Sequence, residues 1–278
     1  MDKRLSPGLH IVATPIGNLG DLSPRAADTL RKADSILVED TRVTAKLLKH
    51  IGAKVPMHRY DDHSSEKDRD AIVARLGGEA IALVSDAGTP LISDPGYKLV
   101  RAARAAGHEV HTVPGPCAAI AALTLAGLPT DRFLFLGFLP AKAKARSDAI
   151  AEIAIVRATL VLYEGGPRLG DTLAALAAQL GPRNAAVARE LTKLHEECVT
   201  GTLQELAARY ADTTPKGEIV VVVGPPLEAE AVSDGALDAL LDAAMEVLSP
   251  SRAAAEVAER LGIARKRAYA RALERSRK

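Results

Sequence analysis

The fold of this chain is decided by the stretch Ile81-Ala82-Leu83-Val84-Ser85-Asp86-Ala87-Gly88-Thr89-Pro90. Its first four residues are apolar, which is typical of a short strand that is covered on both faces of a sheet. The next six residues are small, polar or turn-forming, so the strand ends in a tight turn. A strand followed by such a turn recurs at Thr14-Pro15-Ile16-Gly17-Asn18-Leu19-Gly20-Asp21 and at Val113-Pro114-Gly115-Pro116. Ligands bind at the carboxyl ends of parallel strands, so three such turns favour a binding site over ordinary tight connections.

Short runs rich in Val, Ile and Leu alternate with helical segments as far as Gly224. Strands buried on both faces, with helices between them, are the signature of βαβ units. The predicted strands are 10–13, 36–38, 81–84, 109–113, 133–136, 159–163, 186–189 and 219–223. The sequence therefore predicts an α/β fold of two successive α/β lobes with mainly parallel or mixed sheets, followed by a helical C-terminal tail.

The charge of the chain is balanced as a whole but separated near its end. The 278 residues include 36 basic and 35 acidic ones, for a net charge of +1. Residues 226–248 contain six acidic residues and no basic ones, whereas residues 249–278 contain nine basic residues and three acidic ones. With Gly224-Pro225-Pro226 as a hinge, this shift predicts three parts. They are an N-terminal α/β lobe (1–115), a C-terminal α/β lobe (116–225) and a helical, basic tail (226–278).

The tail has the outline of a helix-turn-helix. Ser249-Pro250 is a helix start, Gly262 would end that helix, and a second helix carries the basic residues. Clustered positive charge on one helix favours contact with nucleic-acid phosphates over the alternatives, which are a solvated hairpin or an oligomer contact. The candidate RNA-binding residues are Arg265, Lys266, Arg267 and Arg271.

Several classes of function have no support in the sequence. No Gly-x-Gly and no Gly-Lys pair occurs, so the dinucleotide fingerprint and the P-loop are both missing. Two cysteines and scattered histidines predict neither a disulfide framework nor a metal site. The longest uncharged stretch, 112–130, is interrupted by prolines and glycines, and the start of the chain does not read as a signal peptide. We therefore expect a soluble, cytoplasmic protein that binds no metal and no membrane.

The strand-end turns, together with further motifs, resemble the tetrapyrrole-methylase superfamily. The resemblance covers residues 8–224 and matches the tail more loosely. The further motifs are Glu39-Asp40-Thr41-Arg42, the extension of the turn 85–90 to Leu91-Ile92-Ser93-Asp94-Pro95-Gly96, and the segments 135–140, 188–197 and 216–220. One stretch departs: the family usually has Tyr-Glu-Ser-Pro-His-Arg-Leu where this chain has Tyr163-Glu164-Gly165-Gly166-Pro167-Arg168-Leu169. Any role that this histidine has in the family is therefore not expected in this chain.

The resemblance implies a fold, an activity and a donor site. Within the superfamily it points to S-adenosylmethionine-dependent methylation of the ribose 2′-oxygen of a cytidine in the decoding region of 16S rRNA. It also implies a homodimer acting on 16S rRNA or the small ribosomal subunit, with the methyl donor in the cleft between the lobes. The donor-binding residues that it implies are Pro15, Ile16, Asp86, Ala87, Gly88, Ala118, Ala119, Leu162, Tyr163 and Leu191. The alternatives are methylation of a tetrapyrrole or a protein histidine, or a non-catalytic RNA-binding factor in ribosome assembly.

A ribose hydroxyl becomes a good nucleophile only when a nearby base removes its proton. The first candidates are Glu39 and Asp40, with Arg42 either holding an acceptor phosphate or pairing with Glu39. Asp40 would equally well cap the helix 41–50. Asp61-Asp62-His63 is a second candidate base or a polar loop. Two further groups are left open. Arg189-Glu190-Leu191 with Lys193 would contribute to the cleft or to the RNA face, or would form a solvated Glu–Lys pair. Lys142, Lys144 and Arg146 would form a flexible basic loop that touches RNA backbone, or an ordinary exposed loop.

Overall fold

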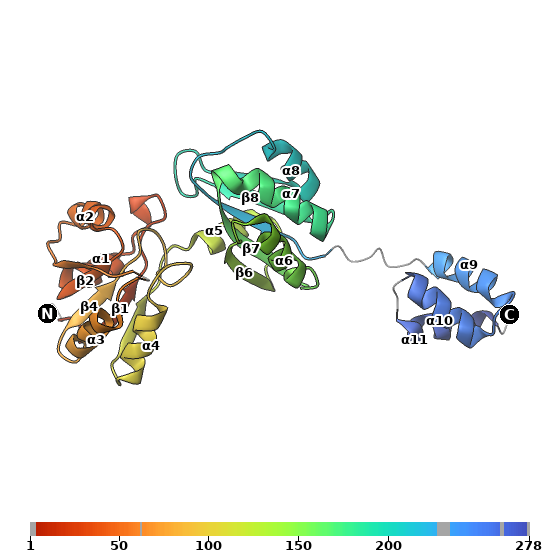
Figure 1. Ribbon diagram of the computed structural model, residues 1–278, viewed down its shortest axis with the longest axis horizontal. Coiled ribbons are helices and arrows are strands. Elements are labelled where there is room, and N and C mark those ends of the chain that lie inside the picture. Colours follow the sequence, from red (N-terminus) through yellow and green to blue (C-terminus); the bar gives the residue numbers. More distant parts are fainter. Residues whose placement is uncertain (1–3, 62, 227–233, 262–263, 277–278) are drawn as a thin grey trace. The chain divides into compact units, whose positions relative to one another are not determined.

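The computed structural model describes residues 4–61, 63–226, 234–261 and 264–276 (Figure 1). One compact unit ends at Pro226, and the C-terminal helices form a second. Asp62 and Gly262, to which the sequence analysis assigned roles, lie outside the described residues. The limits at 115 and 225 remain predictions.

The first sheet is entirely parallel and has the strand order β3-β2-β4-β1-β5. Its strands are β1 (Gly8–Val12), β2 (Ser35–Val38), β3 (Met57–Arg59), β4 (Ala80–Leu83) and β5 (Val110–Val113). The helices between them are α1 (Pro24–Lys32), α2 (Thr41–His50), α3 (Glu66–Arg75) and α4 (Tyr97–Ala105), with the short 3₁₀ turn η1 (Leu19–Asp21). One buried cluster contains Leu30 and Leu47 and another contains Leu76 and Leu99, so helices cover both sheet faces. This arrangement confirms the predicted βαβ lobe.

The second sheet is mixed and has the order β6-β7-β10-β8-β9, in which only the β6–β7 pair is parallel. Its strands are β6 (Phe133–Phe138), β7 (Thr159–Gly165), β8 (Asn184–Arg189), β9 (Glu197–Thr202) and β10 (Glu218–Val223). Its helices are α5 (Ala118–Leu125), α6 (Ala143–Ile153), α7 (Leu169–Leu180) and α8 (Leu203–Tyr210), with the 3₁₀ turn η2 (Gly166–Arg168). Helices α6, α7 and α8 share one buried cluster with the sheet, and α5 shares the cluster on the opposite face.

One detail of the prediction is wrong. Lys142, Lys144 and Arg146 do not form a flexible loop, because α6 begins at Ala143 and Arg146 is buried. Helix α4 begins at Tyr97, after Gly96 at φ 131°. A Cβ on Gly96 would lie 2.8 Å from Leu83 Cδ2, so this entry to α4 requires glycine.

The C-terminal unit contains α9 (Asp234–Met245), α10 (Pro250–Leu261) and α11 (Arg265–Arg275). These helices enclose a small apolar core of their own, which includes Leu237, Leu241, Val257 and Ala268. The predicted helical tail is thus confirmed for the described residues. Among those residues, no helix is both long and apolar enough to span a bilayer.

Within the departure at Gly165-Gly166-Pro167, Gly166 lies at a close approach of two segments. Glu164 is fully buried and accepts hydrogen bonds from Thr172 Oγ1 at 2.6 Å and from the Gly165 N–H at 2.8 Å. It also pairs with Arg168 at 3.3 Å. This network holds η2 against the segment before β10, where a Cβ on Gly166 would overlap the carbonyl oxygen of Pro215. Glycine at 166 is therefore required by packing.

We expect Gly166→Ala to lower the free energy of unfolding by about 1–3 kcal/mol, because the added methyl group forces backbone to move. Urea denaturation measures this change. Gly165→Ala is the matched control, since a Cβ there meets only Pro167 Cδ at 4.0 Å. Equal unfolding midpoints for the two variants would contradict the packing argument.

Candidate active site

A cavity of about 440 Å³ lies within the first compact unit, between the strand-end turns of the first lobe and the second sheet. Its volume is in the range of about 300–1,000 Å³ that is common for small-ligand sites. The lining residues are Ile16, Glu39, Asp86, Ala87, Gly88, Thr89, Ile92, Ser93, Asp94, Cys117, Ala118, Phe138, Tyr163, Glu190, Leu191, Lys193, Gly217, Glu218, Ile219 and Val220.

Hydrogen bonds bring the three predicted turns together at this cavity. Thr14 and Gly88 exchange two bonds, of 2.8 and 3.1 Å, which join the turn after β1 to the turn after β4. Thr89 Oγ1 donates to the Pro116 carbonyl at 2.9 Å and so ties in the third turn. Gly88 has φ 82°, and a Cβ there would lie 3.1 Å from Ile16 Cγ2. The three turns therefore form one wall of the cavity. At position 88 in this wall, a residue larger than glycine would be crowded against Ile16.

Backbone strain gathers at the same place. Among the described residues, the non-glycine residues with positive φ are Leu91 (74°), Ser93 (63°), Glu190 (51°) and Thr192 (64°). Ser93 and Glu190 line the cavity, and the other two lie within two residues of them. Such conformations cost of order 1–3 kcal/mol each and cluster at functional sites. They mark two loops, one from each lobe, as parts of a site.

The polar lining of the cavity is mainly acidic. Glu39, Asp86, Asp94 and Glu218 contribute carboxylates, and Lys193 is paired with Glu190 at 3.0 Å. The carboxylate of Asp86 is positioned by a hydrogen bond of 3.1 Å from the Asp40 N–H to its Oδ1. An excess of carboxylates suits a ligand that carries positive charge. Among the described residues, no group of three or more His, Cys, Asp or Glu side chains could hold a metal ion.

Tyr163 closes the side of the cavity that belongs to the second lobe. Its ring packs edge-on against Phe135 and Phe138, with centroids 5.0 and 5.6 Å away. Gly137, at φ 61°, lies in the register shift of β6 between these two phenylalanines. Burial raises the pKa of the Tyr163 phenol, and its oxygen accepts a hydrogen bond of 3.3 Å from the Ala119 N–H. This phenol therefore stays protonated near neutral pH and does not act as a base there.

Seven of the ten residues proposed for donor binding line the cavity: Ile16, Asp86, Ala87, Gly88, Ala118, Tyr163 and Leu191. The structure places the side chains of the other three elsewhere. Pro15 lines a neighbouring groove, and Ala119 is buried in the cluster beneath α5. Leu162 is fully buried in the core on the opposite sheet face. Successive strand residues point to opposite faces, so Leu162 and Tyr163 cannot both direct side chains into the cavity.

Of the acidic pair, only Glu39 lines the cavity. Asp40 is the N-cap of α2, with Oδ1 accepting from the Arg42 N–H at 2.8 Å. Arg42 pairs with Asp40 at 2.5 Å rather than with Glu39. Asp61 accepts from the His63 N–H at 2.9 Å and from Arg59 Nε at 3.1 Å, as expected for a polar loop.

The Asp40–Arg42 contact predicts an acid-range titration. Bonds from the Arg42 side chain, and then from its N–H, hold the pKa of Asp40 at about 2, against an ordinary 3.8. Because the folded-state pKa is lowered, this carboxylate stabilises the fold above about pH 4 and loses that contribution as the pH falls toward 2. We expect Arg42→Ala to raise the pKa of Asp40 while leaving it below 3.8, since the backbone bond remains.

Carboxyl carbon shifts followed by NMR against pH measure this titration. Arg59→Ala is the control, because Arg59 contributes the smallest of the charge effects on Asp40. A pKa for Asp40 that stays the same in Arg42→Ala would refute the assignment.

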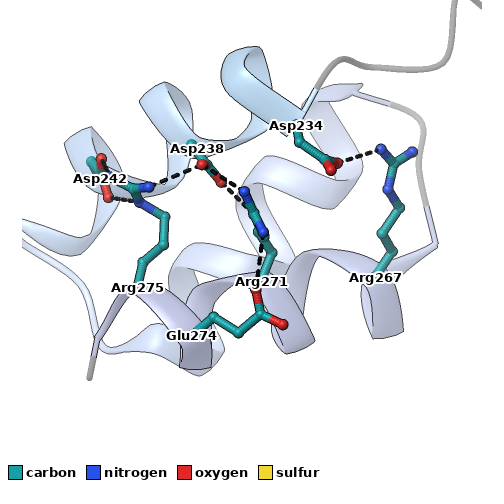
Figure 2. A network of polar contacts seen from close by, with 7 residues as sticks. All are labelled: Asp234, Asp238, Asp242, Arg267, Arg271, Glu274 and Arg275. Carbon is teal, nitrogen blue, oxygen red and sulfur yellow. Dashed lines mark hydrogen bonds and ion pairs between the residues drawn. The ribbon is translucent and has the colours of Figure 1, made fainter. Parts of the chain in front are cut away.

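The basic residues of α11 face acidic residues of α9 (Figure 2). Arg267 pairs with Asp234 at 3.1 Å, and Arg271 with Asp238 at 2.6 Å. Arg275 pairs with Asp238 at 2.9 Å and also with Asp242. We call these six residues the α9–α11 ladder. Two of the four predicted RNA-binding residues, Arg267 and Arg271, are therefore engaged within the unit, whereas Arg265 and Lys266 are exposed.

Sequence reasoning did not single out Asp94, Phe138, Gly217, Glu218 or Val220, all of which line the cavity. Phe138 lies at the end of the irregular segment of β6, and all five residues belong to segments that the family motifs cover. Glu190 and Lys193 had been left open between the cleft and a solvated pair. They do pair, and both line the cavity.

Comparisons with known proteins agree with this architecture. The family model "Tetrapyrrole (Corrin/Porphyrin) Methylases" matches residues 8–207, and "RsmI C-terminal HTH domain" matches residues 231–276. Ribosomal RNA small subunit methyltransferase I of Erythrobacter litoralis is 58% identical over 97% of this chain and 96% of its own length. The protein of the same name from Mesorhizobium japonicum is 47% identical over 97% of this chain and 92% of its own length.

Solved structures show the same fold at low sequence identity. Uroporphyrin-III-C-methyltransferase from Thermus thermophilus aligns with a TM-score of 0.55 and 22% identity, over 78% of this chain and 93% of that chain. A diphthine synthase aligns with a TM-score of 0.62 and 17% identity, over 78% of this chain and 89% of that chain. The chain belongs to the tetrapyrrole methylase family and, within it, to the group of proteins named ribosomal RNA small subunit methyltransferase I.

Proposed function

We propose that this chain uses S-adenosylmethionine to methylate the ribose 2′-oxygen of a cytidine in the decoding region of 16S rRNA. The name shared by its relatives supports small-subunit rRNA as the substrate. The observation that carries a methyl-transfer activity is the 440 Å³ cavity in which three strand-end turns meet a second lobe.

The residues of the cavity fit this donor. Gly88 and Ala118 leave room for a bulky ligand close to backbone groups that can recognise a base edge. Ile16, Leu191 and Val220 supply apolar walls for the ligand's carbon skeleton. Carboxylates suit the donor's sulfonium and ammonium groups, and Lys193 suits its carboxylate.

When bound, S-adenosylmethionine supplies a methyl group on a positively charged sulfur, and transfer requires an oxygen in line with the carbon–sulfur bond. The chain's task is therefore alignment, which can contribute about 7–11 kcal/mol when the geometry is good. Its second task is removal of the hydroxyl proton. Asp40 is engaged as a helix cap and Tyr163 stays protonated, so Glu39 is the predicted candidate base that lines the cavity. Asp86, which was predicted as a donor-binding residue, is a second carboxylate there.

Two measurements test this function. Calorimetry should detect binding of S-adenosylmethionine, and absence of binding at millimolar donor would refute a methyltransferase. Labelled methyl groups should then appear on small ribosomal subunits or 16S rRNA. The methylated position should resist alkaline cleavage, since a 2′-O-methyl group blocks attack on the adjacent phosphate. Label only on a precorrin mixture would support the tetrapyrrole alternative, and donor binding without any transfer would support a non-catalytic assembly factor.

We also propose that the protein acts as a homodimer, as the family resemblance implies, and that it is cytoplasmic and holds no resident metal ion, as its few cysteines and scattered histidines indicate. Sedimentation at several protein concentrations should give the mass of two chains. Transfer should continue in the presence of a strong chelator.

A further inference from the structure

A second hollow lies directly beside the cavity. It has a volume of about 280 Å³ and is formed by the turn after β1, the start of the turn after β4 and one face of α2. We call it the α2 groove. Asp86 lines both the cavity and the groove, and among the described residues it is the one that the two linings share. A molecule in the groove would therefore meet a ligand of the cavity at the carboxylate of Asp86.

The walls of the groove combine apolar and charged groups. Pro15, Leu19 and Val43 form its apolar part, although the side chains of Leu19 and Val43 are 45% and 37% exposed. Lys46, one turn beyond Val43 on α2, is exposed and supplies a positive charge. Ser85 and Asp86 make the opposite end polar. An apolar face, a cation and a carboxylate match, in that order, the base, the phosphate and the ribose hydroxyls of a nucleotide.

The carboxylate of Asp86 is held so that one oxygen remains available. Its Oδ1 accepts the Asp40 N–H at 3.1 Å. Among the described residues, Oδ2 accepts no hydrogen bond. Asp40 is itself fixed as the cap of α2, the helix that forms the groove wall. Two hydrogen bonds, from the Asp40 N–H to Asp86 and from the Arg42 N–H to Asp40, thus link the position of Asp86 to the α2 wall of the groove.

We propose that the α2 groove binds the acceptor nucleotide of a single-stranded RNA segment, with its base against Leu19 and Val43, its phosphate near Lys46 and its 2′-hydroxyl at Asp86. This inference rests on the proposed function and adds the location of the acceptor. The 2′-oxygen then bonds to the methyl carbon as the carbon–sulfur bond breaks. Its proton passes to the Asp86 carboxylate, and S-adenosylhomocysteine leaves.

The groove can be filled without touching the cavity. Val43→Trp places a large side chain on the groove wall, while Ala45→Trp places the same side chain two residues later on α2, where Ala45 lines a different hollow. For Val43→Trp we expect the KM for small ribosomal subunits to rise by at least about 10-fold, with donor Kd changed less than about two-fold. Ala45→Trp should change both values less than about two-fold. Lys46→Ala should raise KM by a few-fold without affecting donor Kd.

A binding measurement separates this inference from the proposed function. Methyl NMR spectra of the full chain with S-adenosylhomocysteine are recorded as cytidine 3′,5′-bisphosphate is added. We expect the Leu19 and Val43 methyl signals to shift, and Val43→Trp to abolish the shift at Leu19. Shifts confined to other parts of the chain, or equal kinetics for the two tryptophan variants, would overturn the groove assignment. Failure of the wild-type chain to methylate rRNA would instead count against the proposed function.

Discussion

Asp86→Asn is expected to reduce the rate of methyl transfer by about 100-fold or more, with a much smaller change in the affinity for S-adenosylmethionine. General base catalysis by a positioned side chain typically contributes 10²–10⁴-fold, and an amide cannot accept the hydroxyl proton. The substitution preserves shape, and the amide oxygen can still accept the Asp40 N–H that now bonds to Oδ1. Single-turnover kinetics with saturating donor and small ribosomal subunits measure the chemical step directly.

The comparison variant is Glu39→Gln, because Glu39 also lines the cavity but does not line the α2 groove. If Asp86 takes the proton, Glu39→Gln should lower the single-turnover rate far less than Asp86→Asn does. A different result would assign the roles differently. If Asp86→Asn weakens donor binding and leaves the rate unchanged, Asp86 serves the donor alone. If Glu39→Gln causes the larger loss of rate, Glu39 is the base.

The strands and helices of the two lobes could be predicted because most of them are buried. Runs such as Ile219-Val220-Val221-Val222-Val223 are apolar at every position, as strands covered on both faces must be. The two strands that were not predicted, β3 and β9, lie at sheet edges and have few buried residues. Their polar or alternating sequences carry no continuous apolar signal. Edge strands form here because a neighbouring strand offers hydrogen bonds.

The candidate site was predicted best where the signal is local. Small residues after a strand indicate backbone close to a ligand, and Asp86, Ala87 and Gly88 do line the cavity. A choice between the two interpretations of Asp40, as a base or as a helix cap, required the position of Arg42, which the sequence does not give. The positive φ angles of Glu190 and Thr192 could not be predicted from residue type, because neither residue is glycine or asparagine. Tertiary packing alone imposes them.

The sequence of the tail contains a spacing of charged residues from which the contact between its helices could have been predicted. Asp234, Asp238 and Asp242 recur every fourth residue, as do Arg267, Arg271 and Arg275. Residues four apart lie on one face of a helix, so the acidic and basic faces could have been expected to meet. Their pairing explains why segments of opposite charge are adjacent in the chain. It also leaves fewer free cations than the sequence count suggests.

Arg265→Glu with Lys266→Glu is expected to weaken binding to 16S rRNA by on the order of 100-fold at low salt. Both residues are exposed at the start of α11 and take no part in the α9–α11 ladder. Each phosphate contact that is lost should lower the steepness of the logarithmic salt dependence by about 0.7–0.9. Two contacts therefore predict a slope smaller by about 1.4–1.8. Filter binding of labelled rRNA across a salt series measures both quantities.

The matched control is Arg252→Glu with Arg260→Glu, which makes the same change in net charge on α10. If the field of the whole unit attracts RNA, both double variants should lose affinity equally. If the start of α11 makes the contact, the α10 variant should keep most of its affinity and nearly all of its slope. In either variant the ladder is left intact, so helical circular dichroism should remain unchanged. Unaltered affinity in both would mean that the tail does not contact RNA, and that its charges serve chiefly to join α9 to α11.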